Sequence, residues 1–183
     1  LDLVRCLDSD NHIESAVALA TINAISNVHT SRCVKGDVLS VVNLLPTDRV
    51  AMVGFFHPIF TELQHRVSEL VVFDEHAPFY DNFKPAGEAV SIIPKCDVAL
   101  ITSTTIINNT LDSLLEAAKD CRETVLIGPS TPLAPEAFEG TSVTCLSGIT
   151  IDQPDGILNV VSEGGGTRLF KPFVSKLNIL LRW

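Results

Sequence analysis

From Arg49 onward, apolar runs of strand length alternate with stretches of helical pattern, and this alternation limits the fold more than any other feature. It is typical of βαβ units, in which parallel strands form a sheet and the connecting helices cover both of its faces. Helical patterns are expected at 59–68, at 109–121 and, more briefly, at 134–140. The sequence therefore predicts an α/β fold with a mostly parallel sheet, whose strands are expected at 49–56, 69–75, 97–103, 124–130 and 142–149.

The two ends of the chain have different patterns. Residues 11–28 predict an amphipathic helix, capped by Asn11 together with Glu14, whose buried stripe consists of Ile13, Val17, Ala20, Ala24 and Val28. A loop with one short strand, at 38–45, is expected to follow. The final segment, 167–182, is expected to be a helix that Pro172 starts or kinks.

Composition argues against some partners. The formal net charge is −9, so nucleic acid and anionic membranes would repel the chain, and we expect neither as a partner. No apolar stretch reaches the length of a membrane span, and the first residues do not have the pattern of a signal peptide. We therefore expect a cytoplasmic protein.

The cysteines and the start of the chain lead to two further expectations. The five cysteines are odd in number and widely spaced, without a CxxC pair, so we expect free thiols packed in the core rather than metal ligands. The chain begins at Leu1 and its single methionine is Met52, so we expect a segment of the natural protein to precede it.

Polar residues gather where the third predicted strand ends. The stretch ITSTTIINNT, 101–110, holds five hydroxyl side chains and two amides. Right-handed crossovers place the carboxyl ends of parallel strands at one edge of the sheet, and open α/β sheets bind ligands there. Asn109 is expected to cap the next helix, whose buried side consists of Leu111, Leu114, Leu115 and Ala118. Four other segments should meet this stretch at the same edge: 54–58, 73–79, 128–135 and 147–155.

The residues at this edge are compatible with several chemistries. A dinucleotide site needs several glycines after the first strand, whereas Gly54 is followed here by Phe55 and Phe56. NAD is therefore not expected, although Asp74 and Glu75 stand where a ribose-binding acid would. The candidate metal ligands at this edge are His57, Asp74, Glu75, His76 and Cys145. They lack the tight spacing of a metal site, so we expect a surface or hydrogen-bonded role for each.

Two further interpretations stay open. A hydroxyl could act as a nucleophile with His57 as its base, and the candidates are Ser103, Thr104, Ser130 and Thr131. Backbone N–H groups at 128–135 and at the glycine run 163–168 could instead hold a carboxylate or a phosphate. Helix capping and a surface loop explain the same hydroxyls and glycines without any ligand.

The order of several short motifs resembles a known family. MVGFF with a following proline, VVFDEHAP, DVALITSTTIINNTLDSLLEAA, LIGPSTPLAPEAF, LSGITI and SEGGGT before LFK are similar to it over about 49–175. It is an uncharacterised prokaryotic family whose proposed role is heavy-metal chelation. The resemblance implies a Rossmann-like domain at 49–183. The helix ESAVALATINAI is similar to the end of that family's enolase N-terminal-like domain, so residues 1–48 would be a truncated α+β remnant of it.

The resemblance also implies a cleft that binds a metal or a metal-chelating small molecule. We expect a metal chelate, with a divalent metal in it, or a related polar molecule, because hydroxyls, amides and backbone N–H groups suit an oxygen-rich organic ligand better than a bare ion. The alternative is an enzyme acting on such a molecule, with His57 or Glu75 as acid or base. A homo-oligomer is a further hypothesis, because the small-residue helix 13–28 needs a partner surface. The expected ligand-binding residues are Gly54, Phe55, His57, Glu75, Ser103, Thr104, Asn108, Thr110, Gly128, Ser130, Thr131, Gly164, Gly165 and Gly166.

Overall fold

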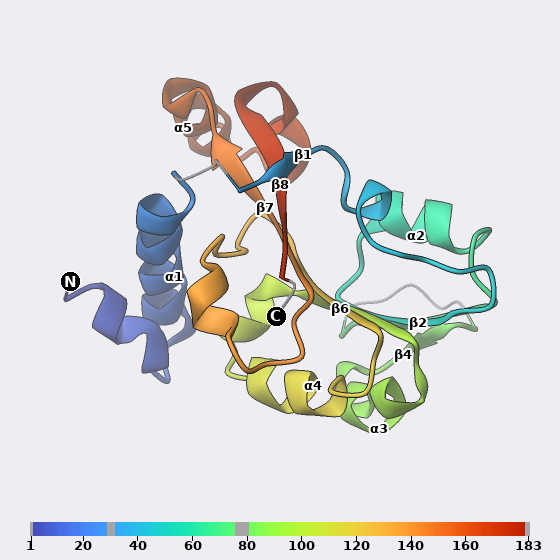
Figure 1. Ribbon diagram of the computed structural model, residues 1–183. Helices are drawn as coiled ribbons and strands as arrows, with labels where there is room; N and C mark the ends of the chain where they lie inside the picture. The colour runs from blue at the N-terminus through green and yellow to red at the C-terminus, as the bar shows by residue number, and fades with distance from the viewer. Residues whose placement is uncertain (1, 29–31, 76–80, 182–183) are drawn as a thin grey trace.

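Parallel strands form the centre of the computed structural model (Figure 1), which describes residues 2–28, 32–75 and 81–181. Within these residues one eight-stranded sheet has the order β1-β8-β7-β6-β5-β2-β3-β4. Strands β2 to β7 pair in parallel, whereas β8 runs antiparallel to β7 and to β1. The mostly parallel sheet is therefore confirmed. The strands are β1 (Val34–Lys35), β2 (Arg49–Val53), β3 (Glu69–Phe73), β4 (Phe83–Lys84), β5 (Val98–Thr102), β6 (Glu123–Ile127), β7 (Cys145–Ile151) and β8 (Val174–Leu180).

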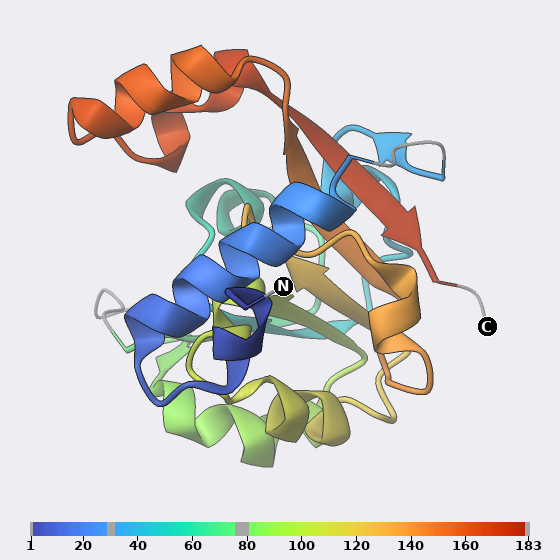
Figure 2. The same ribbon diagram turned by 90° about the vertical axis from the view of Figure 1, so that its left-hand side faces the viewer.

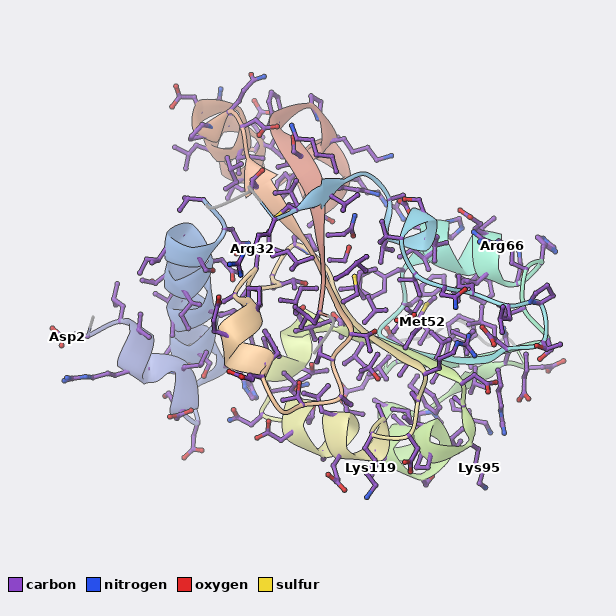
Figure 3. The ribbon with its side chains drawn as sticks, in the orientation of Figure 1. Asp2, Arg32, Met52, Arg66, Lys95 and Lys119 are labelled. Atoms are coloured by element: carbon purple, nitrogen blue, oxygen red, sulfur yellow. The ribbon has the colours of Figure 1, made fainter. Side chains whose placement is uncertain are left out.

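Helices cover both faces of this sheet, as Figure 1 shows. One face is covered by α2 (His57–Leu63) and a 3₁₀ turn at Val38–Ser40, and the other by α3 (Ala89–Ile92), α4 (Leu111–Ala117) and a 3₁₀ turn at Pro135–Phe138. Alternate side chains of each strand enter opposite cores, because successive residues of a strand point to opposite faces. In β2, Met52 is fully buried on the α2 side (Figure 3), while Ala51 is fully buried on the α4 side.

Two helices lie beyond these layers. α1 (His12–Ser26) crosses the carboxyl edge of the sheet, and α5 (Pro154–Ser162) extends from the connection between β7 and β8 (Figure 2). Among the described residues, no helix combines the length and apolarity that crossing a bilayer requires. All five cysteines lie among the described residues and outside disulfides, and the expected burial in the core is seen for Cys96 and Cys145.

The helix predicted at 11–28 forms, but its predicted buried stripe is wrong. The Asn11 side chain accepts the expected capping hydrogen bond from the Ile13 N–H, while the Glu14 carboxylate accepts a hydrogen bond from the Ser9 hydroxyl. The buried positions are on the opposite side of the helix, at Ser15, Ala18 and Leu19, and Asn27 is buried just beyond its end. The predicted stripe faces outward, with Ile13 75% and Val28 62% exposed. The homo-oligomer hypothesis that depended on this helix stays a prediction.

The helix predicted at the end of the chain is wrong as well. Residues 167–173 form two single 3₁₀ turns, and the chain then enters the sheet as β8. Leu177, Ile179 and Leu181 are spaced by two and are buried in one core, which is the spacing of a strand with one side on that core. Phe170, Phe173 and Leu177 are spaced by three and four, so the same segment also fits a helical period.

Two local predictions also differ from the structure. The short strand expected at 38–45 does not form there: Val38–Ser40 is a 3₁₀ turn, in which the Asp37 side chain accepts from the Leu39 N–H and so satisfies a donor at its start. Asn109 does not cap α4, because its φ of 56° is left-handed, whereas a cap needs extended backbone. Thr110 precedes the helix instead. The expected buried side of α4 does form at Leu114, Leu115 and Ala118.

The division of the chain at residue 48 stays a prediction. Just before it, β1 pairs with β8, and Val38, Leu39 and Val42 are buried in the core on the α2 side. Asp48 itself immediately precedes β2, and its carboxylate pairs with the Arg122 guanidinium at 2.6 Å. The segment before residue 48 is thus packed against the sheet.

Candidate ligand-binding site

The strand order reverses between β2 and β5. From β2 the chain continues to β3 and β4 on one side, and then returns to place β5 on the other side of β2. The connection after β2 passes through α2 on one face, and the connection after β5 passes through α4 on the opposite face. Such a reversal opens a crevice outside the carboxyl ends of the two strands, and ligands of open α/β proteins bind in this crevice.

A pocket of about 390 Å³ lies at this reversal, and we call it the switch-point pocket. Its volume is within the range of small-molecule sites. Five predicted site residues line it: Gly54, Glu75, Thr104, Asn108 and Thr110. The strand-end argument therefore placed these five residues in one cavity. The remaining lining consists of Val53, Phe73, Asp74, Ala86, Gly87, Val90, Thr102, Thr105, Ser113 and Leu114.

Gly54 gives the pocket its floor between β2 and β5. Its φ of +85° is one that side-chain-bearing residues rarely adopt, and its N–H donates to the Phe73 carbonyl at 2.8 Å. A Cβ atom at this position would lie 2.9 Å from both Cβ and Cγ2 of Thr102. Glycine is thus required both by the turn and by the close approach of the β5 side chain.

Asp74 fixes the loop that follows Gly54. Its Oδ2 atom accepts a hydrogen bond of 2.9 Å from the Phe55 N–H, which connects the end of β3 to the end of β2. The Phe55 ring then packs edge-on against Phe60 and Phe83, with centroids 5.5 and 5.2 Å away. Phe55 therefore packs against the core on the α2 side and is not among the lining residues of the pocket.

The polar stretch 101–110 divides into structural and accessible groups. The buried hydroxyls hold the backbone: Ser103 Oγ lies 2.6 Å from Thr131 Oγ1, and Thr105 Oγ1 donates to the Thr102 carbonyl at 2.6 Å. The exposed members Thr104, Asn108 and Thr110 line the pocket, next to the less exposed Thr102 and Thr105. Helix capping therefore explains only part of this stretch, and the rest forms a polar surface.

The polar atoms of the pocket are mostly oxygens. Asp74 and Glu75 supply carboxylates, the threonines and Ser113 supply hydroxyls, and Asn108 supplies an amide, whose Oδ1 atom accepts from Thr110 Oγ1 at 2.7 Å. The described lining includes no lysine, arginine, histidine or cysteine. Over the described part of the chain, no three of the His, Cys, Asp and Glu side chains are grouped as a metal site would require. The pocket thus has an acidic, oxygen-rich lining.

Several predicted site residues lie elsewhere. His57 begins α2 and is exposed, with its ring edge-on to Phe55 at 6.0 Å, and it does not line the switch-point pocket. Ser103 and Thr131 are buried against each other. Gly128 lines a smaller hollow on the α2 side, and Ser130 lines a groove beneath α1. His76, named among the metal-ligand candidates, is outside the described residues.

The glycine run ends α5 and does not enter the switch-point pocket. The Gly164 N–H donates to the Val161 carbonyl and the Gly165 N–H to the Val160 carbonyl, which satisfies the last carbonyls of the helix. Gly164 has a φ of +74°, and a Cβ on Gly165 would lie 2.8 Å from the Val160 oxygen. Gly166 continues this turn into the one at Thr167–Leu169. The prediction that these glycines join the strand ends at one cleft therefore has no geometric support.

Sequence reasoning missed the connection of α1 to this edge. Asn27 donates to the carbonyls of Thr131 and Ile149 and accepts from the Leu133 N–H at 2.7 Å. Asn23, one turn earlier, donates to the Ser130 carbonyl at 2.8 Å. The signal was the pair of amides four residues apart on an otherwise apolar helix. Together they hold α1 across the strand ends (Figure 2).

Comparison with known proteins gives a family match. The model of the DUF364 family, described as "Putative heavy-metal chelation", matches residues 37–179. An uncharacterised protein of Methanocaldococcus jannaschii is 26% identical over 174 residues, which cover 93% of this chain and 67% of that protein.

Two crystal structures have the same fold. A DUF364 protein of unknown function from Pyrococcus horikoshii superposes with a TM-score of 0.89 at 27% identity, over 99% of this chain and 74% of that one. Another from Desulfitobacterium hafniense gives 0.86 at 27% identity, over 98% and 73%. The family model, the sequence relative and both structures agree, and the chain belongs to the DUF364 family.

Proposed function

We propose that the switch-point pocket binds a polar organic small molecule, and specifically a metal chelate in which the organic part supplies the metal's ligands. One observation carries this proposal: an acidic, oxygen-rich pocket of about 390 Å³ lies where the strand order reverses. The description of the family as a heavy-metal chelation family supports the metal in the ligand.

The donor set supports a chelate rather than a bare heavy-metal ion. Soft metals prefer thiolate ligands and borderline metals such as nickel and zinc suit imidazole, whereas carboxylate and hydroxyl oxygens suit hard cations and hydrogen-bonding organic groups. The hydroxyls of Thr104 and Thr110 and the amide of Asn108 can donate or accept hydrogen bonds with such groups. The carboxylates of Asp74 and Glu75 favour a ligand of net positive charge or one rich in O–H and N–H groups.

A thermal-unfolding panel on the metal-stripped protein tests the proposal. Nickel or zinc alone, ethylenediamine or triethylenetetramine alone, and the preformed complexes, which carry a net positive charge and N–H donors, are compared at equal concentration. A ligand at a hundred times its dissociation constant stabilises a protein by about 2.7 kcal/mol, which raises the melting temperature of a domain of this size by several degrees. We expect the largest shift with a preformed complex.

Matched variants assign the binding to the pocket. Thr104→Val removes one exposed hydroxyl from the lining and should weaken binding about threefold to tenfold, as expected for the loss of one hydrogen bond. Thr61→Val makes the same change on the exposed side of α2, outside the pocket, and should leave binding unchanged. The proposal is wrong if the free metals give the full shift, or if the two variants bind every complex equally.

A further inference from the structure

We propose that the smaller hollow between α2 and the carboxyl ends of β6 and β7 is a second binding site, which takes a single aromatic ring carrying a carboxylate. This hollow has a volume of about 180 Å³. An engineered apolar cavity of about 150 Å³ binds benzene. The space therefore suits one six-membered ring with a small substituent.

The walls of the hollow are apolar and come from three parts of the chain. Phe56 and Ile59 line it from the start of α2, Ile127 and Pro129 from the end of β6, and Phe170 from the turns before β8. Gly128 lies beneath Phe56: a Cβ atom on this glycine would be 3.8 Å from the edge of the Phe56 ring. Aromatic and aliphatic side chains on several sides match the face and the edge of a bound ring.

The mouth of the hollow has one uncompensated positive charge. Lys176 and Asp37 both line it, and they pair with each other at 2.9 Å. Burial acts to raise the pKa of Asp37, but hydrogen bonds from Lys176 and the Leu39 N–H, together with the charge of Lys176, outweigh it and lower that pKa, so the Asp37 carboxyl is ionised at neutral pH. Lys171, which is exposed, forms no ion pair with a carboxylate of the described residues.

This charge balance selects the anion. One free ammonium next to a neutralised pair matches the charge of a monoanion such as a carboxylate, whereas a dianionic phosphate would keep one charge without a matching cation. The preference is opposite to that of the switch-point pocket, which contains two carboxylates and no basic side chain among its described lining. The two cavities are separated by the loop after β2, because Gly54 lines one and Phe56 the other. Their ligands are therefore of different chemistry.

Titration of the full chain with benzoate, benzamide and acetate, followed by amide NMR, tests this site. Benzoate has both the ring and the charge, benzamide has the ring alone, and acetate has the charge alone. We expect benzoate to bind most tightly and to shift the amide signals of Gly128 and Gly148, which both line the hollow. The signal of Gly87, in the switch-point pocket, should stay in place.

Charge variants separate this site from general attraction of anions. Lys171→Gln should weaken benzoate binding about threefold to fivefold, as expected for a partly exposed ion pair, and leave benzamide binding unchanged. Lys95→Gln removes the same charge at the far end of the molecule (Figure 3) and should change neither. Equal effects of the two variants, or benzoate binding no tighter than acetate, would overturn the proposal. Thr104→Val, in the switch-point pocket, should not change the affinity for benzoate. The two proposals can therefore be tested, and can be wrong, independently of each other.

Discussion

At the scale of single residues, Gly54 connects backbone conformation to the shape of the switch-point pocket. Gly54→Ala combines a left-handed φ with a Cβ atom 2.9 Å from Thr102, so it should destabilise the protein by about 1–3 kcal/mol in urea unfolding. Gly87→Ala is the matched control in the same pocket, because its φ is not left-handed and no atom lies within 4 Å of the added Cβ. It should change the stability by less than about 0.5 kcal/mol. Equal urea midpoints for the two variants would show that neither the left-handed φ nor the close approach of Thr102 restricts the residue at position 54.

Single residues also show how far the site could be predicted. Gly54, Glu75 and Thr104 lie within two residues of a strand's end, and the carboxyl ends of parallel strands meet by topology, so their sequence positions were sufficient to bring them together. Gly165 follows a helix instead, and its surroundings depend on how that helix packs. Its role at the end of α5 required contacts with Val160 and Leu169, which spacing along the chain does not reveal.

At the scale of elements, α1 is held at the edge by amides, and Asn27 makes three of these contacts. Asn27→Ala leaves two carbonyls and the Leu133 N–H without this partner, at a cost of about 2–3 kcal/mol. We expect α1 to open locally, which hydrogen exchange would detect as faster exchange in 12–26 while β5 and β6 keep their protection. Asn159→Ala, on the exposed side of α5, is the control. Unchanged exchange in α1 would show that apolar packing holds this helix.

Sequence patterns misassigned two elements, the last segment and the buried face of α1. The last segment is compatible with two periods, and α1 has apolar residues on two faces. The segment before and within β8 fits both a helical and a strand period, and its pairing with β7 decides for the strand. In α1 the stripe through Ile13 and Val17 is more apolar than the face that is buried, which includes Ser15. Local pattern could not identify the buried face, because the hydrogen bonds of Asn23 and Asn27 with distant loops are not visible in it.

At the scale of the whole molecule, buried thiols predict how stability depends on alkaline pH. Burial raises the pKa of Cys121 to about 11 and that of Cys145 to about 12, from an ordinary value of 9.0. Below pH 9 the thiols are protonated in both the folded and unfolded chain, so they give no pH dependence. Above pH 9 the unfolded chain releases these protons first, and the free energy of unfolding falls until the pH passes the folded pKa.

Cys145 is the sharpest test, because it lies fully buried in β7 and should ionise only when the sheet itself unfolds. Its thiol should lower the free energy of unfolding by about 1.4 kcal/mol for each pH unit well above 9. Cys145→Ala removes this term and adds a packing loss that does not depend on pH. Urea unfolding of both proteins under reducing conditions, from neutral pH to about 10.5, should therefore show their stability difference constant below pH 9 and shrinking above it. A difference that stays constant over the whole range would mean that the Cys145 thiol reaches solvent without unfolding of the sheet.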